Sequence, residues 1–245
     1  MCTLIALLQV VAGYPLVVAM NRDELYDRPS LPPQLRISPA KLVAPRDERA
    51  EGTWIGVNED GVVAALSNRF NGTDPTARSR GLLCLESLAQ PTAAKASMFA
   101  SEAAEAHRYN GFNLLHGDAL RVVCTSHGSG TWTVHGMRGA NVLTNAGLND
   151  ANDPRAQRVR ALLKGAPMGS LDVAVESLRR VLADHVDAGG RSICFHGERA
   201  GTRSQSIVAV GDAGWSGNRW WYAEGYPCTA KSIDFSNLFR YAPTE

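Results

Sequence analysis

Two apolar segments open the chain and constrain its fold more than any other feature. Residues 3–10 and 16–20 are almost continuously apolar, and the turn sequence Ala12-Gly13-Tyr14-Pro15 separates them. This pattern predicts a β-hairpin. Because neither strand alternates with polar residues, we expect the hairpin to lie in a sheet that is covered on both faces. The chain therefore starts inside its own core.

The apolar region at residues 3–20 lacks the features of a targeting or membrane sequence. It has no basic start, and Gln9, Gly13 and Pro15 interrupt the apolar run before a polar stretch begins at Asn21. A secretory signal needs a charged start and a small-residue cleavage site, and a membrane helix needs about 20 apolar residues. We expect no membrane insertion.

The rest of the chain alternates groups of strands with groups of helices, which is typical of a layered α+β domain with stacked sheets. We expect one domain, residues 1–245, with no linker or repeat. The stretch 24–52 is rich in Pro, Arg and Asp without periodicity and predicts a long surface loop. The pattern predicts strands at 53–57, 62–66, 112–115, 120–126, 131–135, 141–144, 206–210, 219–223 and 231–235, and helices at 81–89, 93–107, 155–163 and 171–186.

Composition excludes several classes of function. With 25 basic and 24 acidic residues the net charge is +1, so the chain has no electrostatic footprint for nucleic acid. The five cysteines lack the CxxC spacing of a zinc ribbon, and we expect Cys84, Cys124 and Cys194 to be buried apolar residues. The six histidines show no ligand spacing. We therefore expect no metal and no cofactor, and a reducing, cytoplasmic location.

Cys2 is the first candidate for chemistry. Removal of Met1 would leave a thiol and a free α-amine on one residue, with ordinary pKa values of about 8.5 and about 7.7–8.0. Such a residue carries its own general base, as N-terminal threonine nucleophiles do. The alternative is a buried apolar cysteine with no chemical role.

Four polar residues, Asn21-Arg22-Asp23-Glu24, end the second apolar segment. In a hairpin the end of the second strand lies beside the start of the first. Asp23 is therefore placed to orient the Cys2 ammonium or to accept a hydrogen bond from it. The alternative is an ordinary solvated turn.

Two further residues are candidates by position. Arg203 precedes the apolar segment 206–210 and could bind a substrate carboxylate or support a thiolate, or it could be a surface arginine at a strand edge. Trp54 follows the long predicted loop, and could belong to the core or line a pocket.

Taken together, these segments resemble the NRDE family, the relatives of the transport and Golgi organisation protein. The resemblance rests on Met1-Cys2-Thr3, Asn21-Arg22-Asp23-Glu24 with Arg28-Pro29, Gly52-Thr53-Trp54-Ile55-Gly56-Val57, Ala64-Ala65-Leu66-Ser67-Asn68, Leu143-Thr144-Asn145 and Gly201-Thr202-Arg203. It implies a branch of the N-terminal nucleophile hydrolases with a four-layer αββα sandwich. We also expect a bacterial source.

A more distant resemblance, to choloylglycine hydrolases and penicillin V acylases, implies roles for individual residues. Cys2 would attack an amide, Asp23 would orient it, and Asn145 would stabilise the oxyanion with a second group at Ser67 or, as we favour, Asn68. Those enzymes carry an arginine just before Asn-x-Asp, where this chain has Met20. Arg22 directly precedes Asp23, and neighbouring strand residues face opposite sides, so Arg22 is not an obvious replacement.

The sequence thus supports two functions. The first is hydrolysis of a non-peptide amide C–N bond in a small acylated substrate, with Cys2, Asp23, Asn145, Asn68 and Arg203 as catalytic groups. In this function Asn21, Arg22 and Trp54 would bind the substrate. The second is a non-catalytic carrier of a lipid or haem-like ligand on the same scaffold. The segments 24–52 and 69–79 would shape the pocket, and the identity of the substrate and the oligomeric state stay open.

Overall fold

Two antiparallel sheets form the centre of the protein. The computed structural model describes residues 2–38, 40–69, 72–186 and 192–240. In this described part, the first sheet has the strand order β10-β1-β2-β11-β12-β13 and the second runs from β3 to β9 in chain order. The first sheet comprises β1 (Thr3–Val11), β2 (Tyr14–Leu25), β10 (Gly139–Leu143), β11 (Ala200–Val210), β12 (Arg219–Glu224) and β13 (Ile233–Asp234). The second comprises β3 (Ser30–Arg36), β4 (Leu42–Asp47), β5 (Ile55–Asn58), β6 (Val63–Asn68), β7 (Phe112–Gly117), β8 (Val122–His127) and β9 (Thr131–His135).

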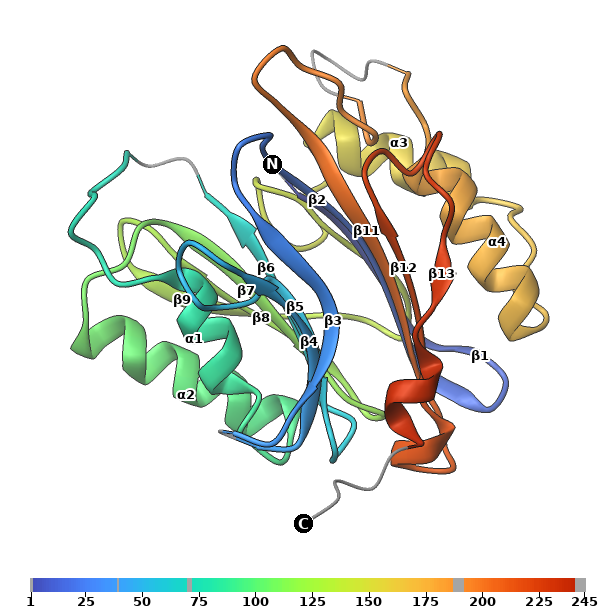
Figure 1. Ribbon diagram of the computed structural model, residues 1–245, viewed down its shortest axis with the longest axis horizontal. Helices are drawn as coiled ribbons and strands as arrows, with labels where there is room; N and C mark the ends of the chain where they lie inside the picture. The colour runs from blue at the N-terminus through green and yellow to red at the C-terminus, as the bar shows by residue number, and fades with distance from the viewer. Residues whose placement is uncertain (1, 39, 70–71, 187–191, 241–245) are drawn as a thin grey trace.

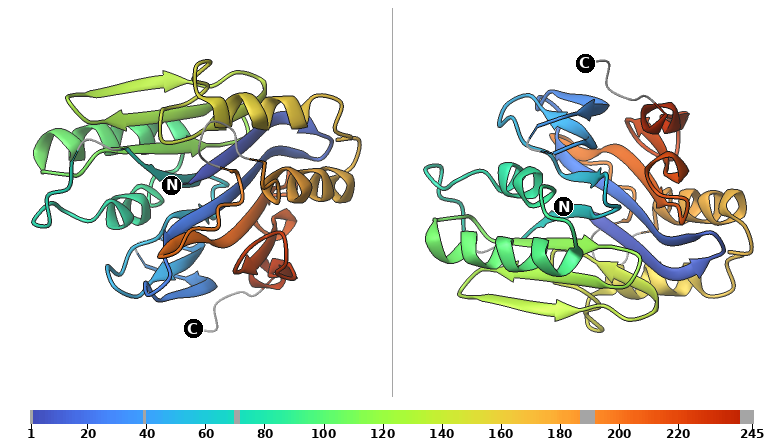
Figure 2. Two further views of the ribbon diagram at one scale, coloured as in Figure 1. Left: turned by 90° about the horizontal axis from the view of Figure 1, so that it is seen from above. Right: turned by 90° about the horizontal axis from the view of Figure 1, so that it is seen from below.

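Helices cover the outer face of each sheet, which makes four layers (Figures 1 and 2). Helices α1 (Arg80–Ser87) and α2 (Ala93–Ala106) pack on the second sheet, and α3 (Pro154–Leu163) and α4 (Leu171–Leu182) pack on the first. The predicted αββα sandwich is confirmed.

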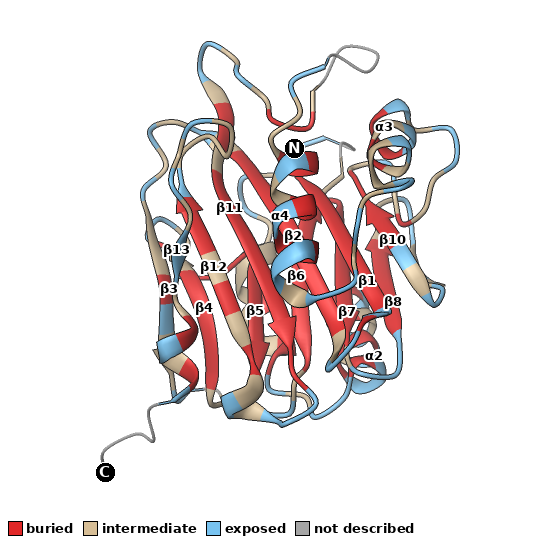
Figure 3. Ribbon diagram, turned by 90° about the vertical axis from the view of Figure 1, so that its right-hand side faces the viewer, coloured by how far each residue is buried: buried red, intermediate tan, exposed pale blue. Residues whose placement is uncertain are grey.

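Three hydrophobic cores separate the four layers. One lies between the sheets, one between the first sheet and α3 and α4, and one between the second sheet and α1 and α2. Along β1, Leu4 and Ala6 belong to the core between the sheets, whereas Ile5 and Leu7 face the helices. Each strand of the predicted hairpin is therefore buried on both faces, as its continuous apolar sequence requires (Figure 3).

The hairpin itself is tighter than the sequence suggested. Val11 pairs with Tyr14, so Ala12 and Gly13 alone form the turn. Gly13 has a φ of 77°, a left-handed conformation that glycine adopts without steric cost.

The predicted long loop at 24–52 is wrong. Strand β2 continues to Leu25, and β3 and β4 occupy most of the remainder. Strand β3 is the edge of its sheet, and its pairing with β4 shifts register between Leu31 and Gln34, around two prolines. Edge strands tolerate proline because one row of their N–H groups has no ladder partner, which is why the composition resembled that of a loop.

Other boundaries differ in ways that matter for the site. Strand β11 begins at Ala200. Arg203, which we expected to precede a strand at 206–210, therefore lies within β11. Helix α4 ends at Leu182, four residues before the predicted end. Helix α3 starts at Pro154, with the Asp153 side chain accepting a hydrogen bond from Arg155 N–H at the cap. Within the described residues, no helix has the length and apolar character needed to cross a membrane.

A close contact between two glycines joins the second sheet to α1. A Cβ atom on Gly52 would lie 2.2 Å from the carbonyl carbon of Gly81, and Thr53 N–H donates to the Gly81 carbonyl at 3.0 Å. We expect Gly52→Ala to push α1 away and destabilise the fold by about 3 kcal/mol or more. That loss corresponds to a fall in melting temperature of roughly 6–12 °C for a chain of this size.

Gly130→Ala is the matched control for this prediction. No atom lies within 4 Å of a Cβ on Gly130, and its φ is not positive. Both variants are compared with the wild type by thermal unfolding. Equal melting temperatures for all three proteins would contradict the prediction.

Candidate active site

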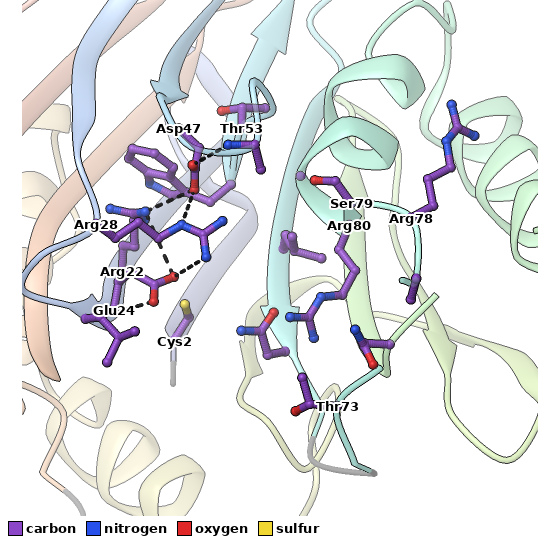
Figure 4. A pocket seen from close by; sticks show the side chains of 18 of the residues that line it. Cys2, Arg22, Glu24, Arg28, Asp47, Thr53, Thr73, Arg78, Ser79 and Arg80 are labelled. Carbon is purple, nitrogen blue, oxygen red and sulfur yellow. Dashed lines mark hydrogen bonds and ion pairs between the residues drawn. The ribbon is translucent and has the colours of Figure 1, made fainter. Parts of the chain in front are cut away.

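A cavity of about 780 Å³ lies where the ends of β2, β4 and β6 meet the start of α1. Figure 4 shows Cys2, Arg22 and Glu24 on one wall and Arg80 on the other. Of the residues singled out from the sequence, five line the cavity: Cys2, Arg22, Asp23, Trp54 and Asn68. The volume suits a small-molecule ligand.

The Cys2 thiol is buried at the start of β1. Thr3 pairs with Asn21, and continuing this register sets Cys2 opposite Arg22 on the face between the sheets. Burial raises the pKa of the thiol. The charge of the chain's amino terminus, a main-chain hydrogen bond from Asp23 and the Arg22 charge act in the opposite direction, whereas the Asp23 charge adds to the effect of burial. The surroundings therefore contain groups that favour the thiolate.

Asp23 is a buried carboxyl at the end of β2. Burial raises its pKa from 3.8 to about 6, although the amino-terminal charge, a Thr202 hydrogen bond and the Arg155 charge lower it. Thr202 Oγ1 donates to Asp23 Oδ1 at 2.6 Å, and the Phe195 main-chain N–H donates to Thr202 Oγ1 at 2.9 Å. Strand β11 thus holds the carboxyl group in one orientation.

Arg22 lies between an aromatic ring and two carboxylates. Its guanidinium carbon is 4.1 Å from the centroid of a Trp54 ring, and its Nη2 is 3.3 Å from Asp47 Oδ2 and 4.0 Å from Glu24 Oε2. Positions 20 and 22 of a strand share a face. Arg22 therefore occupies the same face as Met20 and Cys2, contrary to the expectation that it would face away from the position of the missing arginine.

Sequence reasoning missed Asp47, which organises this wall. Its Oδ2 accepts from Arg28 Nε at 2.7 Å and from Arg22, and its Oδ1 accepts from the main-chain N–H groups of Arg49 and Ala50 at 3.0 Å. Asp47 ends β4, a strand that the interpretation of 24–52 as a loop concealed. The Leu42-Val43-Ala44 run was the signal that could have identified this strand.

Asn145 lies beside the cavity and is not among the residues that line it. Its Nδ2 donates to the Asn68 carbonyl and, at 3.4 Å, to Ser67 Oγ. Ser67 is buried, whereas Asn68 lines the cavity. The two segments expected to form the oxyanion site are therefore adjacent.

Asn21 and Arg203 are bound elsewhere. Asn21 Nδ2 donates to the carbonyls of Leu182 and Ile193 at 2.8 and 3.0 Å, on the side of the sheet that faces α4. Arg203 donates to the carbonyls of Leu25 and Tyr26 and lies 3.6 Å from Glu224. Neither lines the cavity. Their contacts instead hold the backbone at the two ends of Asn21-Arg22-Asp23-Glu24, which we call the strand-end motif.

The opposite wall holds two further arginines that sequence reasoning missed. Arg78 is paired with Glu86 at 2.6 Å and donates to Tyr109 at 3.0 Å. Arg80 donates to the Gly111 carbonyl at 2.9 Å and forms no ion pair with any described residue. Its guanidinium points into the cavity towards the side that carries Cys2 (Figure 4). Arg80 thus presents a positive charge to the cavity, where burial lowers its pKa and the charge of Glu24 raises it.

Comparison with known families identifies the chain. The model of the Transport and Golgi organisation 2 family matches residues 1–217. The chain belongs to this family. The resemblance that the sequence suggested is confirmed.

Curated relatives of the Transport and Golgi organisation 2 family include a homologue from Mus musculus and one from Homo sapiens. They are 34% and 35% identical to this chain over 110 residues. The match covers 43% of this chain and 40% of the length of each relative. These relatives are mammalian, contrary to the bacterial source that we expected.

Two solved structures with a similar fold are named as an acid amidase and a bile acid hydrolase. One is a Caenorhabditis elegans orthologue of N-acylethanolamine-hydrolyzing acid amidase, with a TM-score of 0.57 and 13% identity over 85% of this chain and 92% of that chain. Another is an arginine-to-leucine variant of conjugated bile acid hydrolase from Clostridium perfringens, with a TM-score of 0.61 and 14% identity over 96% and 93%. At this identity the likeness concerns the fold.

The raised pKa of Asp23 makes a testable contribution to stability. Because the folded chain holds this proton more tightly than the unfolded chain, the contribution is complete below about pH 4 and is lost as pH rises through about 6. We expect Asp23→Asn, which keeps an acceptor for Thr202, to gain stability relative to the wild type over this range. The expected gain is on the order of 3 kcal/mol.

Denaturant unfolding of both proteins at pH 4, 5, 6 and 7 measures this difference. Asp60→Asn, at an exposed turn, is the control and should show a nearly constant difference. The prediction would be refuted if the unfolding free energy of the wild type increased relative to that of Asp23→Asn as pH rises. That result would mean that the folded state favours the ionised carboxylate.

Proposed function

We propose that the chain is an N-terminal nucleophile hydrolase that cleaves a non-peptide amide C–N bond in a small acylated substrate. The observation that carries the proposal is the Cys2 thiol at the wall of a cavity, with the Asp23 main-chain N–H and the Arg22 charge acting on it. The fold shared with an acid amidase and a bile acid hydrolase supports it.

The proposed reaction begins with removal of Met1, which lies outside the described residues. The α-amine of Cys2 then takes the thiol proton, and the sulfur attacks the amide carbon. The oxyanion that forms is stabilised by N–H donors. The new ammonium protonates the departing amine, and water hydrolyses the thioester to release the acid and regenerate Cys2.

Three residues have roles that follow from their contacts. Asp23, held by Thr202, orients the Cys2 ammonium and lowers the cost of its charge. Asn145 Nδ2 has a weak hydrogen bond at 3.4 Å to Ser67, and a substrate oxyanion would replace that bond while the one to Asn68 stays. Arg22 supports the thiolate through its charge, because it shares a strand face with Cys2.

The substrate that fits this cavity carries an anionic group. Arg22 and Arg28 are neutralised by Asp47 and Glu24, and Arg78 by Glu86. Arg80 remains, half-buried and without an ion-pair partner among the described residues. A carboxylate or similar group on the substrate would form a bidentate pair with it. We keep a cytoplasmic location in the proposal, because all five cysteines are free.

The first test concerns Cys2. We expect intact-mass measurement to show loss of Met1, and a thiol-directed acylating probe to modify Cys2 faster than Cys84, because Cys2 lines the cavity whereas Cys84 is fully buried in the core under α1. Cys2→Ala should keep the fold, lose this labelling and lose amide hydrolysis. A folded, processed protein that binds acylated ligands without labelling or turnover at Cys2 would favour the carrier function instead.

A second test concerns Arg80. We expect Arg80→Gln to raise KM about tenfold or more for an N-acyl amino acid with a free carboxylate, and to leave KM for its neutral amide nearly unchanged. Arg78→Gln is the matched control, since its charge is already paired with Glu86. Equal effects of the two substitutions on both substrates would refute the role of Arg80.

A further inference from the structure

Four potential metal ligands from three separate segments converge at one end of the first sheet. They are His185, just after α4, Cys194 and His196, in the connection to β11, and Cys228, between β12 and β13. Their ligand atoms all lie within 4.8 Å of one another. Sequence spacing did not reveal this cluster, because 32 residues separate the last two ligands and a helix end supplies the first.

Weak contacts join three of these four side chains. His196 Nε2 is 3.4 Å from Cys194 Sγ and also 3.4 Å from Cys228 Sγ. A neutral imidazole nitrogen has one lone pair, and a thiol is a weak donor. Two thiols at equal distances from one nitrogen therefore cannot both form good hydrogen bonds to it, whereas a shared cation would bind all three atoms.

We propose that His185, Cys194, His196 and Cys228 form a structural zinc site. Two thiolates and two imidazoles are a typical tetrahedral donor set for zinc. With Zn–S near 2.3 Å and Zn–N near 2.0–2.1 Å, a tetrahedral site sets a nitrogen and a sulfur about 3.5 Å apart. The two observed nitrogen–sulfur distances of 3.4 Å agree with this geometry, and ligand atoms that lie farther apart, up to 4.8 Å, would draw together around the ion.

Surrounding contacts hold the ligands in place. The Cys194 main-chain N–H donates to the Asp184 carbonyl at 2.9 Å, and Asp184 forms a two-pronged ion pair with Arg158 at 2.7 and 3.1 Å. The Tyr226 ring stacks on His196 with centroids 3.8 Å apart. Metal sites depend on such supporting contacts to orient their ligands.

Four protein ligands fill a tetrahedral coordination shell, so the site has no open position for a substrate and its role is structural. Zinc would fasten the end of α4, the segment before β11 and the β12–β13 connection to one another. Phe195 lies between two of the ligands, and its N–H donates to Thr202, which in turn donates to Asp23. The site therefore also supports the backbone that orients Asp23.

The test uses the full chain purified under reducing conditions. We expect about one zinc ion per chain by elemental analysis, and the absorption of tetrahedral thiolate-bound Co²⁺ after exchange with Co²⁺ alone. Cys228→Ser and His196→Ala should lose both signals and melt at a lower temperature, as should wild type treated with a chelator. His135→Ala, which changes an exposed histidine in β9, should retain both signals.

Circular dichroism of each variant confirms that loss of metal is not loss of fold. Three results would overturn the proposal: no zinc or Co²⁺ bound by the reduced wild type, equal metal content in Cys228→Ser, or a Cys194–Cys228 disulfide as the stable form in a reducing buffer. These readouts do not depend on hydrolysis, so the zinc site can be refuted without refuting the proposed activity, and the reverse.

Discussion

Burial of β1 and β2 on both faces is the constraint on which the rest of the structure depends. Leu4 and Met20 pack between the sheets, whereas Ile5 and Ala19 pack against the helix layer. A slip of one residue would exchange the faces of every side chain on a strand, and both cores would have to repack. The register is therefore strongly determined, and the position of Cys2 at the start of β1 follows from it.

The strand-end motif concentrates charge at the point where this hairpin meets the cavity. A buried charge is costly unless it is paired and hydrogen-bonded. Arg22 meets that requirement with Asp47, Glu24 and the face of Trp54. On the other face, the Nδ2 group of the buried Asn21 side chain donates to two main-chain carbonyls. The consecutive residues Asn21 and Arg22 thus make their contacts on opposite faces of β2.

Strand β11 connects the two sites. Its pairing with β2 shifts register between Thr202 and Ser204, and such irregularities re-aim side chains. Thr202 points at Asp23, while the neighbouring Arg203 binds carbonyls at the end of β2. The segment just before β11 carries two of the proposed zinc ligands. A change at the zinc site would therefore reach Asp23 through two hydrogen bonds.

The sequence alone determined the hairpin, the order of most strands and helices, and five of the residues that line the cavity, because apolar periodicity and chain ends are local properties. It misjudged 24–52, since an edge strand tolerates the prolines that also mark loops. Only the tertiary structure brought Asp47 and Arg80 to opposite walls of the cavity and collected His185, Cys194, His196 and Cys228 into one cluster. These groupings join residues far apart in the chain, and packing between layers, which no local pattern encodes, decides which of them meet.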